Sequence, residues 1–207
     1  MKVLIINQHR ADVVGGSEVQ CDLIARGLAE RGHEVTYGVM RPRGRAAGEG
    51  YRCLDVPSPT LSGLRRLFAE ARPEVVYWRF NKHHFLPAAL LARLHGATFL
   101  FALSHDHDPL FWPPRPSAPG EPLRRRLRRA LTRLEDTVNW GGRFFVDGWV
   151  AQHKGQAAVL PPARTRLIHN SVLTEGTAFE WPRPWVAWVG NLKPRKRPEA
   201  FLELAAA

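Results

Sequence analysis

Two adjacent glycines, Gly15 and Gly16, precede Ser17 and Glu18 at the start of a segment whose apolar residues recur at helical spacing. The first N–H groups of a helix have no partner within it, and the helix dipole adds positive charge at that end. A phosphate or a sugar hydroxyl therefore suits such a place. Ser17 is the predicted N-cap of this helix. The alternative interpretation is a tight turn that binds nothing.

Further polar residues follow apolar segments of strand length: Asn81, then His105 with its neighbour Asp106, and finally Asn170. In a parallel sheet the carboxyl ends of the strands meet at one edge, where ligands bind. We therefore expect these residues to share one rim with Gly16. A histidine at such a rim can donate or accept a proton near neutral pH. The alternative for His105 is a loop histidine without a role.

The run from His105 to Asp108 alternates histidine with aspartate, a composition that can serve a metal ion. Pro109 ends the run, and no third ligand has a convincing position. We therefore expect no metal.

A dinucleotide site is not expected either. The glycines do not form G-x-G-x-x-G, and they stand several residues beyond the apolar segment Val3 to Ile6. The next predicted strand, Glu34 to Met40, has no acidic residue at its end to hold a ribose.

Apolar segments of strand length alternate with helical patterns along the chain. The predicted strands are Val3 to Ile6, Glu34 to Met40, Cys53 to Val56, Val75 to Trp78, Thr98 to Leu103, Phe144 to Ala151 and Arg166 to His169. Helices are predicted after Ser17 and at Leu61 to Ala71, Phe85 to His95, Leu123 to Leu134 and Gln152 to Leu160. This alternation predicts an α/β fold, a Rossmann-like parallel sheet with helices on both faces.

The length of 207 residues suits one large domain, or one domain and part of another. Residues 1–173 form the first predicted domain, and residues 174–184 resemble a linker. Residues 185–207 supply one strand and one helix, which cannot bury their apolar faces alone. We therefore expect them to begin a second, truncated domain.

No apolar run reaches the ~18 residues that cross a membrane, and the N-terminal run is too short for a signal peptide. The two cysteines, Cys21 and Cys53, form no disulfide framework or zinc spacing. These features predict a cytoplasmic protein.

The net charge is +11, and six arginines lie between Arg124 and Arg133. Leucines recur among them at helical spacing, so the segment predicts a basic amphipathic helix. A solvated outer face is one interpretation, and an anionic membrane surface is a second. Nucleic-acid binding is a third, but no zinc finger or basic motif with interleaved aromatic residues supports it, so no nucleic acid is expected.

Five stretches resemble, in order, motifs of the family 4 glycosyltransferases. The first resembles the "GGAE … LARGLARRGHEV" opening, and the others resemble "PDVVH", the strand end that presents a histidine, "VIPNGVD" and "VGRLxPxKGxE". In this chain they are Gly15 to Val35, Pro73 to Tyr77, Leu103 to Asp106, Arg166 to Val172 and Val189 to Glu199.

The resemblance implies the GT-B fold, two Rossmann-like domains facing across a cleft, with the N-terminal one complete here. It implies sugar transfer from a nucleotide-sugar with retention, without a metal or any other cofactor. Glycine-loop residues from Gly15 to Glu18 would contact acceptor or donor, and His105 would line the reaction centre. Lys196 matches the lysine that holds the donor diphosphate. Asn191 stands where the family has an arginine.

The resemblance therefore predicts a glycosyltransferase fragment that acts on a glycan, lipid-linked or small-molecule acceptor, in cell-envelope polysaccharide synthesis. We expect the 207-residue chain alone to transfer little sugar. The alternative is a non-catalytic remnant that only binds an acceptor or an anionic membrane. Expected partners are the nucleotide-sugar, the acceptor and the inner face of a membrane, contacted through Arg124 to Arg133.

Overall fold

The computed structural model describes residues 1–44, 48–57, 60–110, 122–171 and 197–206. The chain divides into two compact units, Met1–Ser171 and Val172–Ala207. In the second unit, the described element is helix α6 (Pro198–Ala206). The predicted linker at 174–184 and the strand expected after it lie outside the described residues, and so do Asn191 and Lys196.

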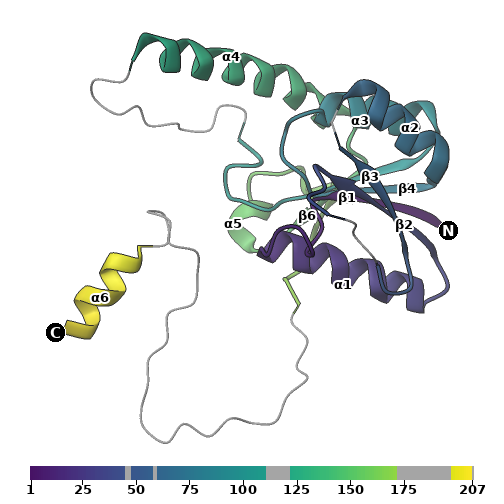
Figure 1. The fold of residues 1–207 in the computed structure, drawn as a ribbon, viewed down its shortest axis with the longest axis horizontal. Helices are drawn as coiled ribbons and strands as arrows, with labels where there is room; N and C mark the ends of the chain where they lie inside the picture. The colour runs from purple at the N-terminus through teal and green to yellow at the C-terminus, as the bar shows by residue number, and fades with distance from the viewer. Residues whose placement is uncertain (45–47, 58–59, 111–121, 172–196, 207) are drawn as a thin grey trace, which may run out of the picture. The chain divides into compact units, whose positions relative to one another are not determined.

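The first unit is built on a seven-stranded sheet in the order β3-β2-β1-β4-β5-β6-β7 (Figure 1). Every neighbouring pair of strands is parallel. The strands are β1 (Lys2–Asn7), β2 (Glu34–Met40), β3 (Arg52–Val56), β4 (Val75–Trp78), β5 (Thr98–Ala102), β6 (Gly148–Ala151) and β7 (Thr165–Leu167). The predicted α/β fold with a Rossmann-like parallel sheet is confirmed.

Helices cover both faces of this sheet, as Figure 1 shows with α1 on one face and α2 and α3 on the other. Successive residues of β1 therefore bury toward opposite layers: Val3 and Ile5 pack with α1, whereas Leu4 and Ile6 pack in the other cluster. The helices are α1 (Gly16–Glu30), α2 (Leu61–Ala71), α3 (Phe85–Leu94), α4 (Leu123–Trp140) and the short α5 (Lys154–Ala157), with 3₁₀ turns η1 (Gly141–Phe145) and η2 (Pro162–Arg164).

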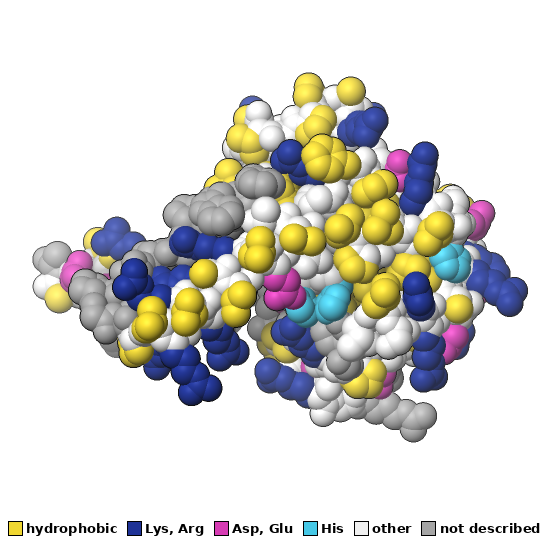
Figure 2. Space-filling model, turned by 90° about the horizontal axis from the view of Figure 1, so that it is seen from above, with side chains coloured by type: hydrophobic (Ala, Val, Ile, Leu, Met, Phe, Trp, Pro, Cys, Tyr) yellow, Lys and Arg dark blue, Asp and Glu magenta, His cyan; other side chains and the backbone are white. Residues whose placement is uncertain are grey.

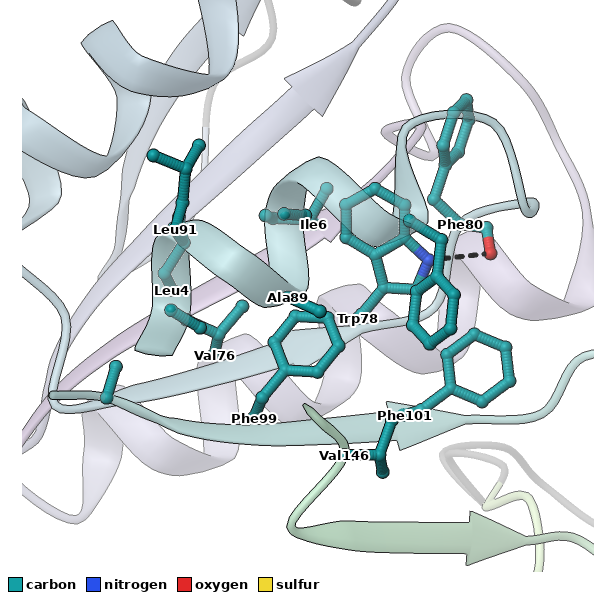
Figure 3. Packing of buried hydrophobic residues seen from close by; sticks show 14 of the residues in the cluster. Leu4, Ile6, Val76, Trp78, Phe80, Ala89, Leu91, Phe99, Phe101 and Val146 are labelled. Carbon is teal, nitrogen blue, oxygen red and sulfur yellow. Dashed lines mark hydrogen bonds between the residues drawn. The ribbon is translucent and has the colours of Figure 1, made fainter. Parts of the chain in front are cut away.

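The larger hydrophobic cluster is rich in aromatic rings (Figure 3). Trp78 is fully buried at the end of β4, and its indole N–H donates to the carbonyl oxygen of Phe80 at 3.1 Å. Phe85 of α3 stacks on Trp140, the last residue of α4, with ring centroids 5.7 Å apart. The core therefore holds the C-terminal end of α4 and the loop after β4 in place.

A glycine is needed at position 142, where η1 packs closely against α3. A Cβ on Gly142 would come within 3.0 Å of the Leu86 Cα and 2.9 Å of the Phe85 ring. A backbone atom cannot move aside as a side-chain tip can. The close approach of η1 and α3 thus depends on the missing side chain.

The predicted strand Phe144 to Ala151 is wrong in its first half. Residues up to Phe145 form η1, and β6 begins at Gly148. The chain turns here because the Val146 N–H bonds back to the Arg143 carbonyl at 3.3 Å. Phe144 is exposed in this turn, so an apolar residue at this position does not indicate a buried strand.

Candidate active site at the carboxyl edge of the sheet

Helix α1 begins at Gly16, with Gly15 as its N-cap, so the predicted N-cap Ser17 is wrong. Gly15 has an extended backbone, and its carbonyl accepts the first helical bond from Val19 at 3.1 Å. The Ser17 hydroxyl instead accepts from the Asn7 amide at 3.3 Å. This contact ties the first turn of α1 to the carboxyl end of β1.

The two glycines differ in the space around them. A Cβ on Gly15 would collide with the Glu18 carboxylate, whereas a Cβ on Gly16 would meet nothing within 4 Å. Glu18 lies in the first turn, where its charge complements the helix dipole. The side of the helix N-terminus at Gly16 remains open to a ligand.

A buried polar chain holds the loop between β1 and α1. The His9 Nδ1 accepts from the Ala11 N–H at 3.2 Å, so the proton resides on Nε2, which donates to the Tyr51 hydroxyl at 2.9 Å. Tyr51 in turn donates to the Asp22 carboxylate of α1. Burial lowers the pKa of His9, in keeping with a neutral ring.

Two arginines complete this support. The Nε atoms of Arg10 and Arg26 lie 3.1 and 3.0 Å from the Asp22 carboxylate, which is almost fully buried. Arg26 also reaches Glu49 at 2.5 Å. The glycine loop is thus fixed by charged and hydrogen-bonded residues that the sequence analysis did not select.

The ends of four strands are joined by one hydrogen-bond network. Arg79, just after β4, donates to the Asn170 side chain at 3.0 Å, and Asn170 donates to Gln152 at 3.1 Å. Gln152 follows β6 and donates to the Leu103 carbonyl at the end of β5. Since Asn170 follows β7, the network spans β4 to β7 along the predicted rim.

Helix α1 joins the same network from the other side. Gln20, one turn after Gly16, accepts from the Ser171 N–H at 2.8 Å and donates to the Ser171 carbonyl. Ser171 directly follows Asn170. The first turns of α1 and the segment after β7 therefore meet, although they lie far apart in the sequence.

Arg79 is the most buried cation of this edge, with 5% of its surface exposed. Its Nε has no hydrogen-bond partner among the described residues. Nearby Tyr77 is buried, which raises its pKa to about 12 although Arg79 opposes the shift. An unpaired N–H on a buried guanidinium is costly. This Nε has almost no exposed surface, so a ligand at the edge would interact with the charge of Arg79 rather than with this N–H.

His105 lies in an exposed turn after β5, and the backbone of that turn is held by the Asp108 carboxylate. Asp108 accepts from the N–H groups of Ser104 and His105 at 2.6 and 2.7 Å. Asp106 accepts from His153 at 2.8 Å and Gln156 at 3.1 Å, and these bonds lower its pKa. Asp106 thus attaches the turn to α5, while the His105 side chain forms no hydrogen bond with another residue in the described ranges.

Asn81 lines an open pocket of about 370 Å³ beside this turn. Its side-chain oxygen accepts from the His83 N–H at 3.0 Å. The pocket takes polar and charged groups from the ends of β2 and β4, from the turn and from α4: Arg41, Asn81, Lys82, His83, His107, Asp108, Thr132, Glu135 and Asp136. It contains His107 rather than His105.

No group of three or more histidine, cysteine or acidic residues in the described ranges could hold a metal ion. Among the predicted site residues, those after strands share the carboxyl edge, and Ser171, the residue after Asn170, contacts α1 through Gln20. The residues missed are Asn7, Gln20, Arg79 and Gln152. Arg79 and Gln152 directly follow strands, the same signal that selected Asn81, and Asn7 is the last residue of β1.

No curated protein sequence matches the chain. The solved structures that share its fold include the following two. Anabaena HepE, solved in complex with UDP, is 17% identical with a TM-score of 0.50, and the match covers 83% of this chain and 44% of that one. A putative UDP-N-acetylglucosamine 2-epimerase from Listeria monocytogenes is 12% identical with a TM-score of 0.52, covering 80% and 44%. The chain spans less than half the length of either.

The family profile described as Glycosyltransferase Family 4 matches residues 14–175. This range begins just before Gly15, and it contains the polar network and the pocket. It covers well over half of the 207 residues. The chain therefore belongs to Glycosyltransferase Family 4.

Proposed function

We propose that this chain provides one side of an enzyme that transfers a sugar from a nucleotide-sugar to an acceptor hydroxyl with retention. The observation that carries the proposal is the presence of a buried cation, Arg79, at the edge to which α1 contributes its N-terminal turns. Family membership supports the type of reaction. The donor is expected to be a UDP-sugar, since HepE was solved with UDP.

In the proposed reaction, the bond between the sugar anomeric carbon and the diphosphate oxygen breaks. A bond to the acceptor oxygen forms on the same face, the acceptor proton passes to the imidazole of His105, and the nucleoside diphosphate leaves. Negative charge grows on the leaving group, so a fixed guanidinium and a helix N-terminus stabilise the transition state. Arg79 and the backbone at Gly16 supply those groups in this chain. Lys196 and Asn191 remain predicted contacts to the donor phosphate.

His105 is proposed to face the reacting sugar, and Asp106 to keep its turn in place through α5. Asn170 holds the Arg79 guanidinium in one orientation. The pocket beside Asn81 is proposed to receive the acceptor, because its volume of about 370 Å³ and polar lining suit a hydroxyl-rich group. The mechanism proposed for these residues needs no metal.

Release of nucleoside diphosphate tests this function. The complete gene product is incubated with a panel of UDP-, GDP- and dTDP-sugars, with and without a mixture of glycan acceptors. We expect one donor to be consumed faster when its acceptor is present, and the anomeric configuration of the product to match that of the donor. Binding of a nucleotide-sugar without turnover under all combinations would favour the non-catalytic alternative.

Gly16→Ala separates ligand contact from folding in the same assay. The open space at Gly16 predicts an unchanged melting temperature, whereas a ligand close to the backbone would be displaced by the added methyl group. The matched control is Gly27→Ala, which lies on the same helix but two residues after the buried Ala25, far from the helix N-terminus. Unchanged donor affinity in Gly16→Ala would remove the glycine loop from the donor site.

A further inference from the structure

Helix α4 carries an apolar stripe that the described part of the chain leaves exposed. The stripe consists of five side chains between 57% and 68% exposed: Leu123, Leu127, Leu131, Leu134 and Val138. They recur at intervals of three and four residues, so they lie on one side of the helix. Seen from above in Figure 2, hydrophobic side chains gather along the projecting helix, with Lys and Arg side chains beside them.

The rest of the helix is not buried either. Among its 18 residues, the buried ones are Asn139 and Trp140 at the C-terminal end. This end packs beside α3 and η1, and the N-terminal end reaches away from the sheet (Figure 1). The core thus anchors α4 by its last turn and leaves its stripe available to a partner.

Arginines border the stripe. With about 3.6 residues per turn, Arg124 lies next to the leucines on one side, and Arg126 on the other. Arg125 lies on the opposite side of the helix. All three side chains are exposed, as is Arg128. No acidic residue occurs in α4 before Glu135, so the projecting part of the helix is uniformly basic.

We propose that α4 lies flat on an anionic lipid bilayer, with its leucines among the acyl chains and its bordering arginines at the lipid phosphates. The charge pattern selects this occupant. If a second copy of the chain packed its own stripe against this one, two arginine-rich helices would lie side by side. Their like charges would repel each other. An anionic bilayer instead provides apolar acyl chains for the leucines and negatively charged headgroups for the arginines. No described helix is both long and apolar enough to cross a membrane.

Docking in this way leaves the pocket accessible. Thr132 and Asp136 line the pocket and lie on the side of α4 opposite to the leucines. The bilayer would therefore contact one side of the helix while a ligand contacts the other. The inference goes beyond the proposed sugar transfer and does not depend on it.

Co-sedimentation with vesicles tests the proposal on the 207-residue chain. Vesicles of phosphatidylcholine with phosphatidylglycerol are compared with vesicles of phosphatidylcholine alone. We expect binding to the anionic vesicles, and weaker binding at higher salt. Arg124→Gln should weaken partitioning about fivefold, the effect of one cation at an anionic surface. The adjacent control, Arg125→Gln, should weaken it less than about twofold.

The leucines give an independent test. Leu127→Ser combined with Leu131→Ser should reduce binding by at least tenfold, because about six buried CH or CH₃ groups are removed from the bilayer. The far-UV circular dichroism and melting temperature should stay the same, since both leucines are exposed.

Three results would overturn the proposal. One is the absence of anionic-vesicle binding in the wild-type chain. Another is an equal loss for Arg124→Gln and Arg125→Gln, which would indicate attraction by net charge alone. The last is a dimer in analytical ultracentrifugation that the leucine substitutions dissociate, which would assign the stripe to a second copy of the chain.

Discussion

Asn170 accepts a hydrogen bond from the buried Arg79 at 3.0 Å, although the two residues are 91 positions apart in the sequence. One follows β7 at the border of the sheet, and the other follows β4 near its centre. The bond spans the ends of the intervening strands β5 and β6, and Gln152 joins it from β6. The carboxyl edge is therefore a preorganised polar surface rather than a set of separate loops.

A double-mutant cycle on Arg79→Met and Asn170→Ala measures this bond. A hydrogen bond to a charged group contributes about 1.5–3 kcal/mol, so we expect a coupling free energy in that range from urea unfolding. The cycle is required because Asn170→Ala alone also removes the bond to Gln152. Additivity within about 0.5 kcal/mol would mean that the bond contributes nothing to stability.

The buried His9 should make stability depend on pH. Burial lowers its folded pKa from 6.5, despite Asp22 and Asp12, so below that pH the unfolded chain binds a proton that the folded chain does not. The stability that the neutral His9 ring contributes should therefore be complete above pH 6.5. The free energy of unfolding should fall as the pH drops from there toward the lowered pKa. His9→Gln, which can still donate to Tyr51, should flatten the profile between about pH 5 and 7.

Urea unfolding of wild type and His9→Gln across that range provides the measurement. A residual slope is expected in the variant, because burial also lowers the pKa of His84. Parallel profiles for the two proteins would show that His9 is not held neutral by the fold.

Two neighbouring glycines should respond differently to alanine. Gly142→Ala places a methyl group 3.0 Å from the Leu86 Cα, and overpacking of this kind costs about 1–3 kcal/mol. Gly141→Ala is the control, since its Cβ would only make an ordinary contact of 3.8 Å with Leu86 Cδ2. Thermal and urea unfolding should separate the two variants. Equal stabilities would mean that η1 can move away from α3.

Most of the fold was predictable because the strands at the centre of the sheet, β1, β4 and β5, are short, mainly apolar runs. Helix α2 has the predicted bounds, Leu61–Ala71, since its apolar residues share one side and Thr60 caps it. The prediction of a strand at Phe144 was wrong because apolar residues can also occupy an exposed 3₁₀ turn. Such a turn is determined by a backbone bond to Arg143, which composition does not reveal.

The site was predictable only in part. Residues after strands could be assigned to one edge, since parallel strands end together, and this principle placed Asn81 and Asn170. The importance of Arg79 could not be predicted, because it arises from its burial and from a bond across the sheet. Gln20 was missed for the same reason: its partner, Ser171, is 151 residues away.

Sugar transfer at this edge is tested most directly by the turnover of the complete gene product with its best nucleotide-sugar, compared with His105→Ala and His107→Ala. A positioned proton-transfer group contributes about 10²-fold or more, so His105→Ala should lower kcat by that factor. Its melting temperature should not change, because the side chain is exposed. His107→Ala should lower kcat much less, since His107 lines the proposed acceptor pocket and its loss would change the acceptor KM instead. Equal, small losses in two well-folded variants would contradict a reaction centre at His105.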